Sequence, residues 1–183
     1  MQSNSIFQFV GFETSVVLEG FIPQWENYAK RVFKKDIHAI SLQQQVASSN
    51  RYKYISRNEW PQENFRFSFM EGRLSTHFPD HKVKVVQAGG YSALQLDCEN
   101  RPEQAEVSVL VFIGDLTVNL DDCRKLPHLF MNIYEAYYQS CLYTFILEYF
   151  IGEDDAGQLL AELKKQFANT EIGIYKECLV LED

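Results

Sequence analysis

The chain has 183 residues, of which 46% are hydrophobic and 23% are charged. This is the composition of an ordinary globular domain, and it excludes a disordered or fibrous chain. No apolar run reaches the roughly 20 residues that a membrane-spanning helix needs, and the first residues carry no basic stretch of the kind that begins a secretory signal. We therefore expect a cytoplasmic protein that has no membrane partner.

Charge is distributed unevenly along the chain. Residues 1–100 contain 11 Lys and Arg against 10 Asp and Glu, whereas residues 101–183 contain 6 against 15. An acidic half repels phosphate backbones, on whose neutralisation nucleic-acid binding depends. The basic cluster within residues 30–35 fits the solvent-facing side of a helix. The sequence therefore predicts that nucleic acid is not a partner.

The four cysteines do not form a recognisable site. Cys98, Cys123, Cys141 and Cys178 include no CxxC pair, and no histidine pair stands at a ligand-like spacing. Structural zinc sites normally show such short spacings, and disulfides are rare in proteins that are not exported. We expect reduced thiols, no metal site and no cofactor.

The first half predicts alternating strands and helices. An apolar run at residues 6–12 is typical of a buried strand, and Phe21, Trp25, Ala29 and Val32 form one face of a helix. Further strands are predicted at residues 38–46, 52–60 and 82–86. Residues 62–74 favour a helix, although the alternation of Phe65, Phe67 and Phe69 leaves a strand open.

The second half repeats this order after a polar connector at residues 98–104. A strand is predicted at residues 107–113, a helix from the apolar stripe at residues 126–137, and a strand at residues 142–151. Acidic residues 153–155 favour the start of a helix, whose buried face includes Leu159 and Leu163. Residues 171–181 close the chain as a strand.

The similar order of the two halves indicates two ferredoxin-like units, residues 1–100 and 105–183, that derive from a duplication. Tyr52–Ile55 aligns with Tyr143–Ile146 at an offset of 91. One larger α+β domain is the alternative. The strand-to-helix junctions lack the glycine-rich loop of a doubly wound nucleotide fold. We predict an α+β fold of tandem ferredoxin-like units, whose antiparallel sheets pack as an intramolecular barrel, in a monomer or a homodimer.

The segment Tyr52–Phe65, YKYISRNEWPQENF, carries a family resemblance. An aromatic strand that ends in Glu-Trp, followed by a polar helix start and a Phe, resembles the dimeric α+β barrel superfamily and its antibiotic biosynthesis monooxygenases. The similarity covers mainly residues 5–96. Members are usually homodimers, so the resemblance implies two subunits fused in one chain.

The resemblance also implies a cavity between sheet and helices that takes hydrophobic aromatic molecules. Trp60 ends the strand at this cavity, and Tyr54, Phe65 and Phe69 are expected to line it. Some members bind or degrade haem, with a Trp at the position of Trp60 and a His from the next helix. His77 is the candidate for that His, although it follows Trp60 by 17 residues, and the family's first-strand Asn is absent. Gln8 is the nearest amide on that strand.

Three functions follow from these observations. The first is the binding of a small hydrophobic or aromatic ligand, with uncertain enzymatic activity of the cofactor-independent monooxygenase kind. The second is a non-catalytic structural or interaction module, because 14 Phe and 10 Tyr are enough to fill a small barrel. The third, which rests on the resemblance alone, is a haem-binding protein. No catalytic residue is predicted.

Overall fold

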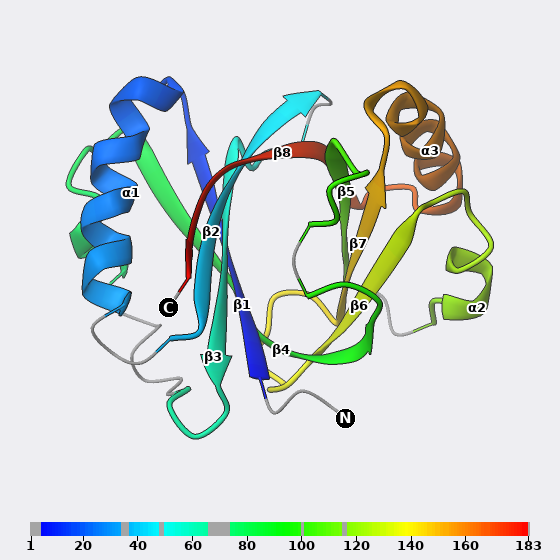
Figure 1. The fold of residues 1–183 in the computed structure, drawn as a ribbon, viewed down its shortest axis with the longest axis horizontal. Helices are drawn as coiled ribbons and strands as arrows, with labels where there is room; N and C mark the ends of the chain where they lie inside the picture. Colours follow the sequence, from blue (N-terminus) through cyan, green and yellow to red (C-terminus); the bar gives the residue numbers. More distant parts are fainter. Residues whose placement is uncertain are drawn as a thin grey trace.

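The computed structural model describes residues 5–33, 37–47, 50–65, 74–99, 101–114 and 117–182, and Figure 1 shows their arrangement. Within these residues, the first half contains four strands, one long helix and a short 3₁₀ helix. These are β1 (Ser5–Thr14), α1 (Leu18–Phe33), β2 (Ala39–Ala47), β3 (Tyr54–Pro61), η2 (Leu74–His77) and β4 (Val83–Leu96). The predicted helix at residues 62–74 lies mostly outside the described residues, and residues 62–64 form a turn.

The described residues of the second half form four more strands and two helices. These are β5 (Val107–Ile113), α2 (Leu120–Cys123), β6 (Phe130–Ala136), β7 (Phe145–Ile151), α3 (Glu153–Gln166) and β8 (Glu171–Glu182). The predicted helix at residues 126–137 is wrong, because β6 occupies its centre. Apolar side chains lie on both faces of this strand, Met131 and Ile133 on one and Tyr134 on the other, and such a pattern also satisfies helical spacing.

The eight strands close into one barrel. Their order is β1-β3-β2-β8-β5-β7-β6-β4, and every pairing is antiparallel. Each half contributes four adjacent strands, β4-β1-β3-β2 from the first and β8-β5-β7-β6 from the second. The halves join where β2 pairs with β8 and where β4 pairs with β6. The predicted fold class, two ferredoxin-like sheets packed as an α+β barrel, is therefore confirmed.

The helices cover the outside of the barrel (Figure 1). Helix α1 packs Phe21, Trp25 and Ala29 of its predicted apolar face into one cluster with the outward side chains of β1, β2 and β3. Helix α3 packs Leu159 and Leu163 against the outward valines of β5. Among the described residues, no helix is long and apolar enough to cross a membrane.

The interior of the barrel is a third cluster, made of the side chains that alternate with those under the helices. It is rich in aromatic rings and contains Phe7, Phe9, Tyr52, Tyr91, Phe112, Tyr134 and Tyr175. Phe9, for example, contacts Tyr134 and Tyr91 edge-on, with ring centroids 5.1 and 5.9 Å apart. Side chains from the two halves therefore fill this part of the interior together.

Four tyrosines at one end of the barrel show how closely the two halves correspond. Tyr52 and Tyr143, each two residues before its strand β3 or β7, share a hydrogen bond between their hydroxyl groups. The Tyr175 hydroxyl donates to the Tyr52 carbonyl over 2.9 Å, and the Tyr91 hydroxyl donates to the Tyr143 carbonyl over 3.2 Å. Tyr91 and Tyr175 occupy matching positions in β4 and β8, since they pair with Phe7 and Ser108 on matching strands. Each half thus makes the same contact to the other.

Candidate functional site

The predicted site residues that the structure describes come together, but as parts of a packed core. Tyr54 and Trp60 lie on the face of β3 that α1 covers, and Phe65 follows the turn after β3; all three are buried. Tyr54 stacks on Phe21 with ring centroids 4.3 Å apart, and its hydroxyl donates to the Val16 carbonyl. Phe69 lies outside the described residues.

A buried polar network holds Trp60 in place. The Trp60 indole N–H and the Asn58 amide N–H both donate to Gln8 Oε1 over 2.9 Å. Asn58 also donates to the Tyr28 hydroxyl of α1 over 2.6 Å, and burial raises the pKa of that hydroxyl. Buried polar groups are costly unless they are paired in this way. The sequence singled out Gln8 as the nearest first-strand amide, but nothing in the spacing indicated that it meets Asn58.

His77 lies against α1, beside Tyr28 and Arg31. Its ring lies 5.9 Å from that of Tyr28, and its Nδ1 is 3.3 Å from Arg31 Nη1. A haem would require an open slot beside Trp60, whereas Tyr54, Trp60 and Phe65 are packed in one cluster, so this arrangement does not fit the group. No cluster of three or more His, Cys, Asp or Glu that could hold a metal ion occurs in the described part of the chain.

A chain of aromatic contacts leads from Trp60 to the surface. The ring of Phe65 meets that of Trp60 edge-on, with ring centroids 6.4 Å apart, and it also stacks on the ring of Tyr138, with centroids 5.9 Å apart. Tyr138 in turn contacts Tyr137 at 4.8 Å. The two tyrosines border an open hollow of about 400 Å³, which we call the tyrosine hollow; its lining residues are Glu135, Ala136, Tyr137, Tyr138, Gln139, Cys141, Tyr143 and Thr144.

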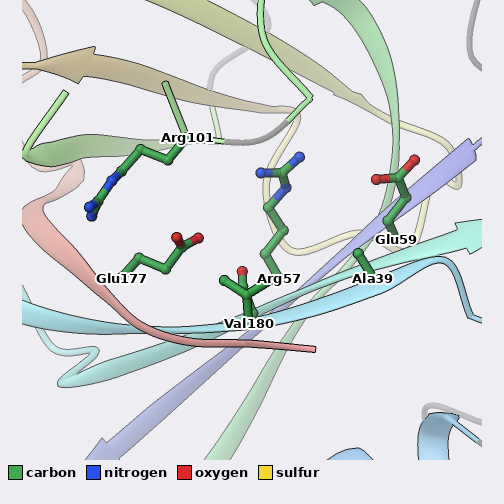
Figure 2. A pocket seen from close by; sticks show the side chains of 7 residues that line it. Ala39, Arg57, Glu59, Arg101, Glu177 and Val180 are labelled. Carbon is green, nitrogen blue, oxygen red and sulfur yellow. The ribbon is translucent and has the colours of Figure 1, made fainter. Parts of the chain in front are cut away.

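A charged cavity that sequence reasoning missed is lined mainly by residues of β2, β3 and β8. It measures about 70 Å³ and is lined by Ala39, Ser41, Arg57, Glu59, Arg101, Glu177 and Val180. In Figure 2, the Arg57 guanidinium lies between Glu59 on one side and Glu177 with Arg101 on the other. We call this site the charged mouth.

Arg57 connects the charged mouth to a carboxylate deeper in the barrel. Its Nη1 lies 3.8 Å from Glu148 Oε2, and its Nη2 donates to the Glu99 carbonyl over 2.7 Å. Burial by itself lowers the pKa of Arg57. The opposite effect of four neighbouring side chains is larger, so the net shift is upward; they are Tyr134, Glu148, Glu59 and Glu177. Arg57 is therefore a permanent cation.

Glu148 is fully buried and accepts hydrogen bonds from several neutral groups. The Tyr134 hydroxyl donates to Glu148 Oε2 over 2.8 Å, and Asn132 Nδ2 donates to the same oxygen over 3.3 Å. Gln43 Nε2 donates to Glu148 Oε1 over 3.4 Å. Burial is also the main cause of the raised pKa of Tyr134. One signal could have revealed this site: a carboxylate within the otherwise apolar run of β7 is costly to bury without a cation.

Comparison with known proteins supports the fold. Neither a protein-family model nor a curated protein matches the sequence. Two mutants of chlorite dismutase from Candidatus Nitrospira defluvii are similar in structure. One has a TM-score of 0.57 and 9% identity, over 95% of this chain and 92% of that one. The other has a TM-score of 0.54 and 12% identity, over 96% of this chain and 93% of that one. An anthrone oxidase-like protein matches with a TM-score of 0.57 and 10% identity, over 97% of this chain and 93% of that one. The chain shares its α+β barrel fold with these proteins.

Proposed function

We propose that this chain binds a small hydrophobic or aromatic molecule at the tyrosine hollow. The observation that carries the proposal is the line of ring contacts from Trp60 through Phe65 to Tyr138, which borders that hollow. Its volume of about 400 Å³ lies within the range of about 300–1,000 Å³ common for ligand pockets. Tyrosines offer a ligand both an apolar ring and a hydroxyl group.

The choice of probe follows from the chemistry of the hollow and from the fold. A flat aromatic ketone can stack on the rings of Tyr137 and Tyr138 and accept a hydrogen bond from a tyrosine hydroxyl. The anthrone oxidase-like neighbour is named for a molecule of this class. Anthrone is therefore the first probe, and no cofactor is added to the assay.

The rival function is an interaction module without a ligand. It is favoured by the aromatic interior of the barrel and by the packing of Tyr54, Trp60 and Phe65 under α1. In that case the tyrosine hollow is only a surface depression, and no small aromatic molecule stabilises the protein.

The two functions are separated by a thermal-shift and tryptophan-fluorescence titration with anthrone. Saturable quenching and a rise in melting temperature are expected for the wild type, because a ligand that binds only the native state stabilises it. Tyr138→Ala should abolish both effects. Phe167→Ala is the matched control, since Phe167 borders another surface hollow of similar size, about 420 Å³. A flat response of the wild type across anthrone and related aromatics contradicts the ligand site and supports the interaction module.

A further inference from the structure

The paired hydroxyl groups of Tyr52 and Tyr143 leave one hydrogen for a third group. The two hydroxyls share a hydrogen bond in which either oxygen can be the donor. Each phenol carries a single O–H donor, so one hydrogen of the pair is used between the two rings and the other remains. Which tyrosine keeps that hydrogen decides what the pair can bind.

Burial assigns the remaining hydrogen to Tyr143. Tyr52 is 1% exposed, and among the described residues its hydroxyl has Tyr143 as its one partner. If Tyr143 were the donor, the Tyr52 hydrogen would lie in the interior without an acceptor, which is unfavourable for a buried polar group. Tyr52 therefore donates to Tyr143. Tyr143 is half-buried and lines the tyrosine hollow, so its own hydrogen is available to a molecule bound there.

The surroundings of the pair favour Tyr143 as a donor. Burial raises the pKa of Tyr52, and the hydrogen bond to Tyr143 raises it further. Burial also raises the pKa of Tyr143, whereas the hydrogen bond from Tyr52 and the charge of Arg51 act in the opposite direction. These two groups stabilise negative charge on the Tyr143 oxygen. Because linked hydrogen bonds polarise one another, the outer hydroxyl of such a chain is a stronger donor than an isolated one.

The charges around the pair favour an uncharged ligand. Arg51 is paired with Glu13 at 3.0 Å, and Lys84 contacts the same carboxylate at 3.1 Å. The Arg51 backbone N–H donates to Glu171, so two cations face two carboxylates. Of the described residues that line the hollow, Glu135 alone carries a charge. A carboxylate or phenolate would meet no excess of positive charge here, whereas a ketone oxygen accepts a hydrogen bond without carrying a charge.

We propose that Tyr143 selects an uncharged aromatic ketone in the tyrosine hollow by donating a hydrogen bond to the carbonyl oxygen. Tyr52 is a positioning residue, because its hydroxyl sets the direction of the hydrogen bond but does not line the hollow. Stacking on Tyr137 and Tyr138 serves any flat aromatic molecule, and Tyr143 adds the preference for one with a carbonyl group. This selection rests on the ligand site proposed above.

Anthrone and 9,10-dihydroanthracene separate the ketone preference from binding as such. The two share a three-ring skeleton, but dihydroanthracene has a CH₂ group where anthrone has its carbonyl. In a tryptophan-fluorescence titration, the wild type should bind anthrone about fivefold more tightly, which corresponds to about 1 kcal/mol, the contribution typical of one neutral hydrogen bond. Equal binding of the two molecules overturns the ketone preference and leaves the proposed function standing. Absence of saturable binding by both overturns the two proposals together.

Two variants assign the donor. Tyr143→Phe keeps the ring and removes the hydroxyl, so it should abolish the preference for anthrone. Tyr52→Phe should reduce the preference only in part, because Tyr143 keeps its hydrogen but loses the group that directs it. Tyr149→Phe is the matched control, since its hydroxyl donates to the Cys123 carbonyl and Tyr149 does not line the hollow; the preference should stay about fivefold.

The carbonyl stretching band of bound anthrone gives a readout that a change in stability does not move. A hydrogen bond to the carbonyl oxygen lowers the frequency of this band in the infrared spectrum. The band should therefore lie lower in the wild type and in Tyr149→Phe than in Tyr143→Phe, with Tyr52→Phe between them. A band position that Tyr143→Phe leaves unchanged refutes the assignment of Tyr143 as the donor.

Discussion

The buried pair of Arg57 and Glu148 offers the sharpest test of what stabilises the barrel. Replacing Glu148 by Leu removes the carboxylate and leaves the Arg57 cation with one close partner fewer. Breaking a buried ion pair from one side costs about 3–5 kcal/mol, because the remaining charge is no longer compensated. The Tyr134 hydroxyl also loses its acceptor, which adds about 1–3 kcal/mol.

Two features of the structure place the ion-pair contribution at the lower end of this range. The Arg57–Glu148 separation of 3.8 Å is longer than the 2.7–2.9 Å of a strong charge-assisted hydrogen bond. Glu59 and Glu177 line the same cavity as Arg57 and still compensate part of its charge. We therefore expect Glu148→Leu to lower the free energy of unfolding by about 4 kcal/mol in total.

A double-mutant cycle measures the interaction itself. Glu148→Leu, Arg57→Met and the double variant are unfolded in urea, and the free energies are compared at pH 7. Because the double variant removes both charges together, it should be more stable than the sum of the single effects predicts, by about 1–3 kcal/mol. Glu148→Gln keeps one of the two oxygen acceptors and replaces the other by an amide group, so it should cost less than Glu148→Leu. Additive effects within about 0.5 kcal/mol would show that the two charges do not interact, and the reasoning would be refuted.

Three further predictions concern other parts of the core. Burial raises the pKa of five tyrosines, Tyr28, Tyr91, Tyr134, Tyr149 and Tyr175. Because these tyrosines ionise near pH 10 only in the unfolded chain, the free energy of unfolding should be constant up to about pH 10 and then fall by about 1.4 kcal/mol per pH unit for each of them. Urea unfolding between about pH 8 and 11 checks this, and a flat profile contradicts it. Gly11→Ala should cost about 1–3 kcal/mol, because its Cβ would lie 2.5 Å from the Tyr52 ring, whereas Gly114→Ala, with no atom within 4 Å, should be close to neutral in the same assay. Gln8→Leu leaves the Trp60 and Asn58 donors without their shared acceptor, so we expect a loss of about 2–4 kcal/mol and an altered tryptophan emission; an unchanged melting temperature would argue against the network.

The sequence predicted the fold class because the decisive signals were local. Continuous apolar runs indicated the buried strands β1 and β5, and the spacing of Phe21, Trp25 and Ala29 indicated α1. Strand β6 was missed for a physical reason. A strand in a closed barrel that is covered on its outer face is buried on both sides, so it loses the alternation that distinguishes a strand from a helix. Duplication of residues 1–100 as residues 105–183 stays a prediction, which the equivalent tyrosine contacts support.

The candidate site was less accessible to sequence reasoning. Tyr54, Trp60 and Phe65 were identified because aromatic residues near a strand end stand out in the sequence. The charged mouth was not, because Arg57, Arg101 and Glu177 come from three segments that only barrel closure brings together. Their spacing along the chain contains no motif, and a charged residue in a loop or strand is usually solvated. Only the register of β2 with β8 places Glu177 near Arg57.

The positions of Arg57 and Glu148 have a consequence for how such a barrel can be assembled. Arg57 is the fourth residue of β3 and Glu148 the fourth residue of β7, the matching strands of the two halves. A symmetric dimer of one half would place two arginines, or two glutamates, on these buried positions and would repel itself at its centre. Opposite charges at matching positions require two different halves. When both halves belong to one polypeptide, Arg57 always meets Glu148. Each half can then also carry side chains that the other half lacks.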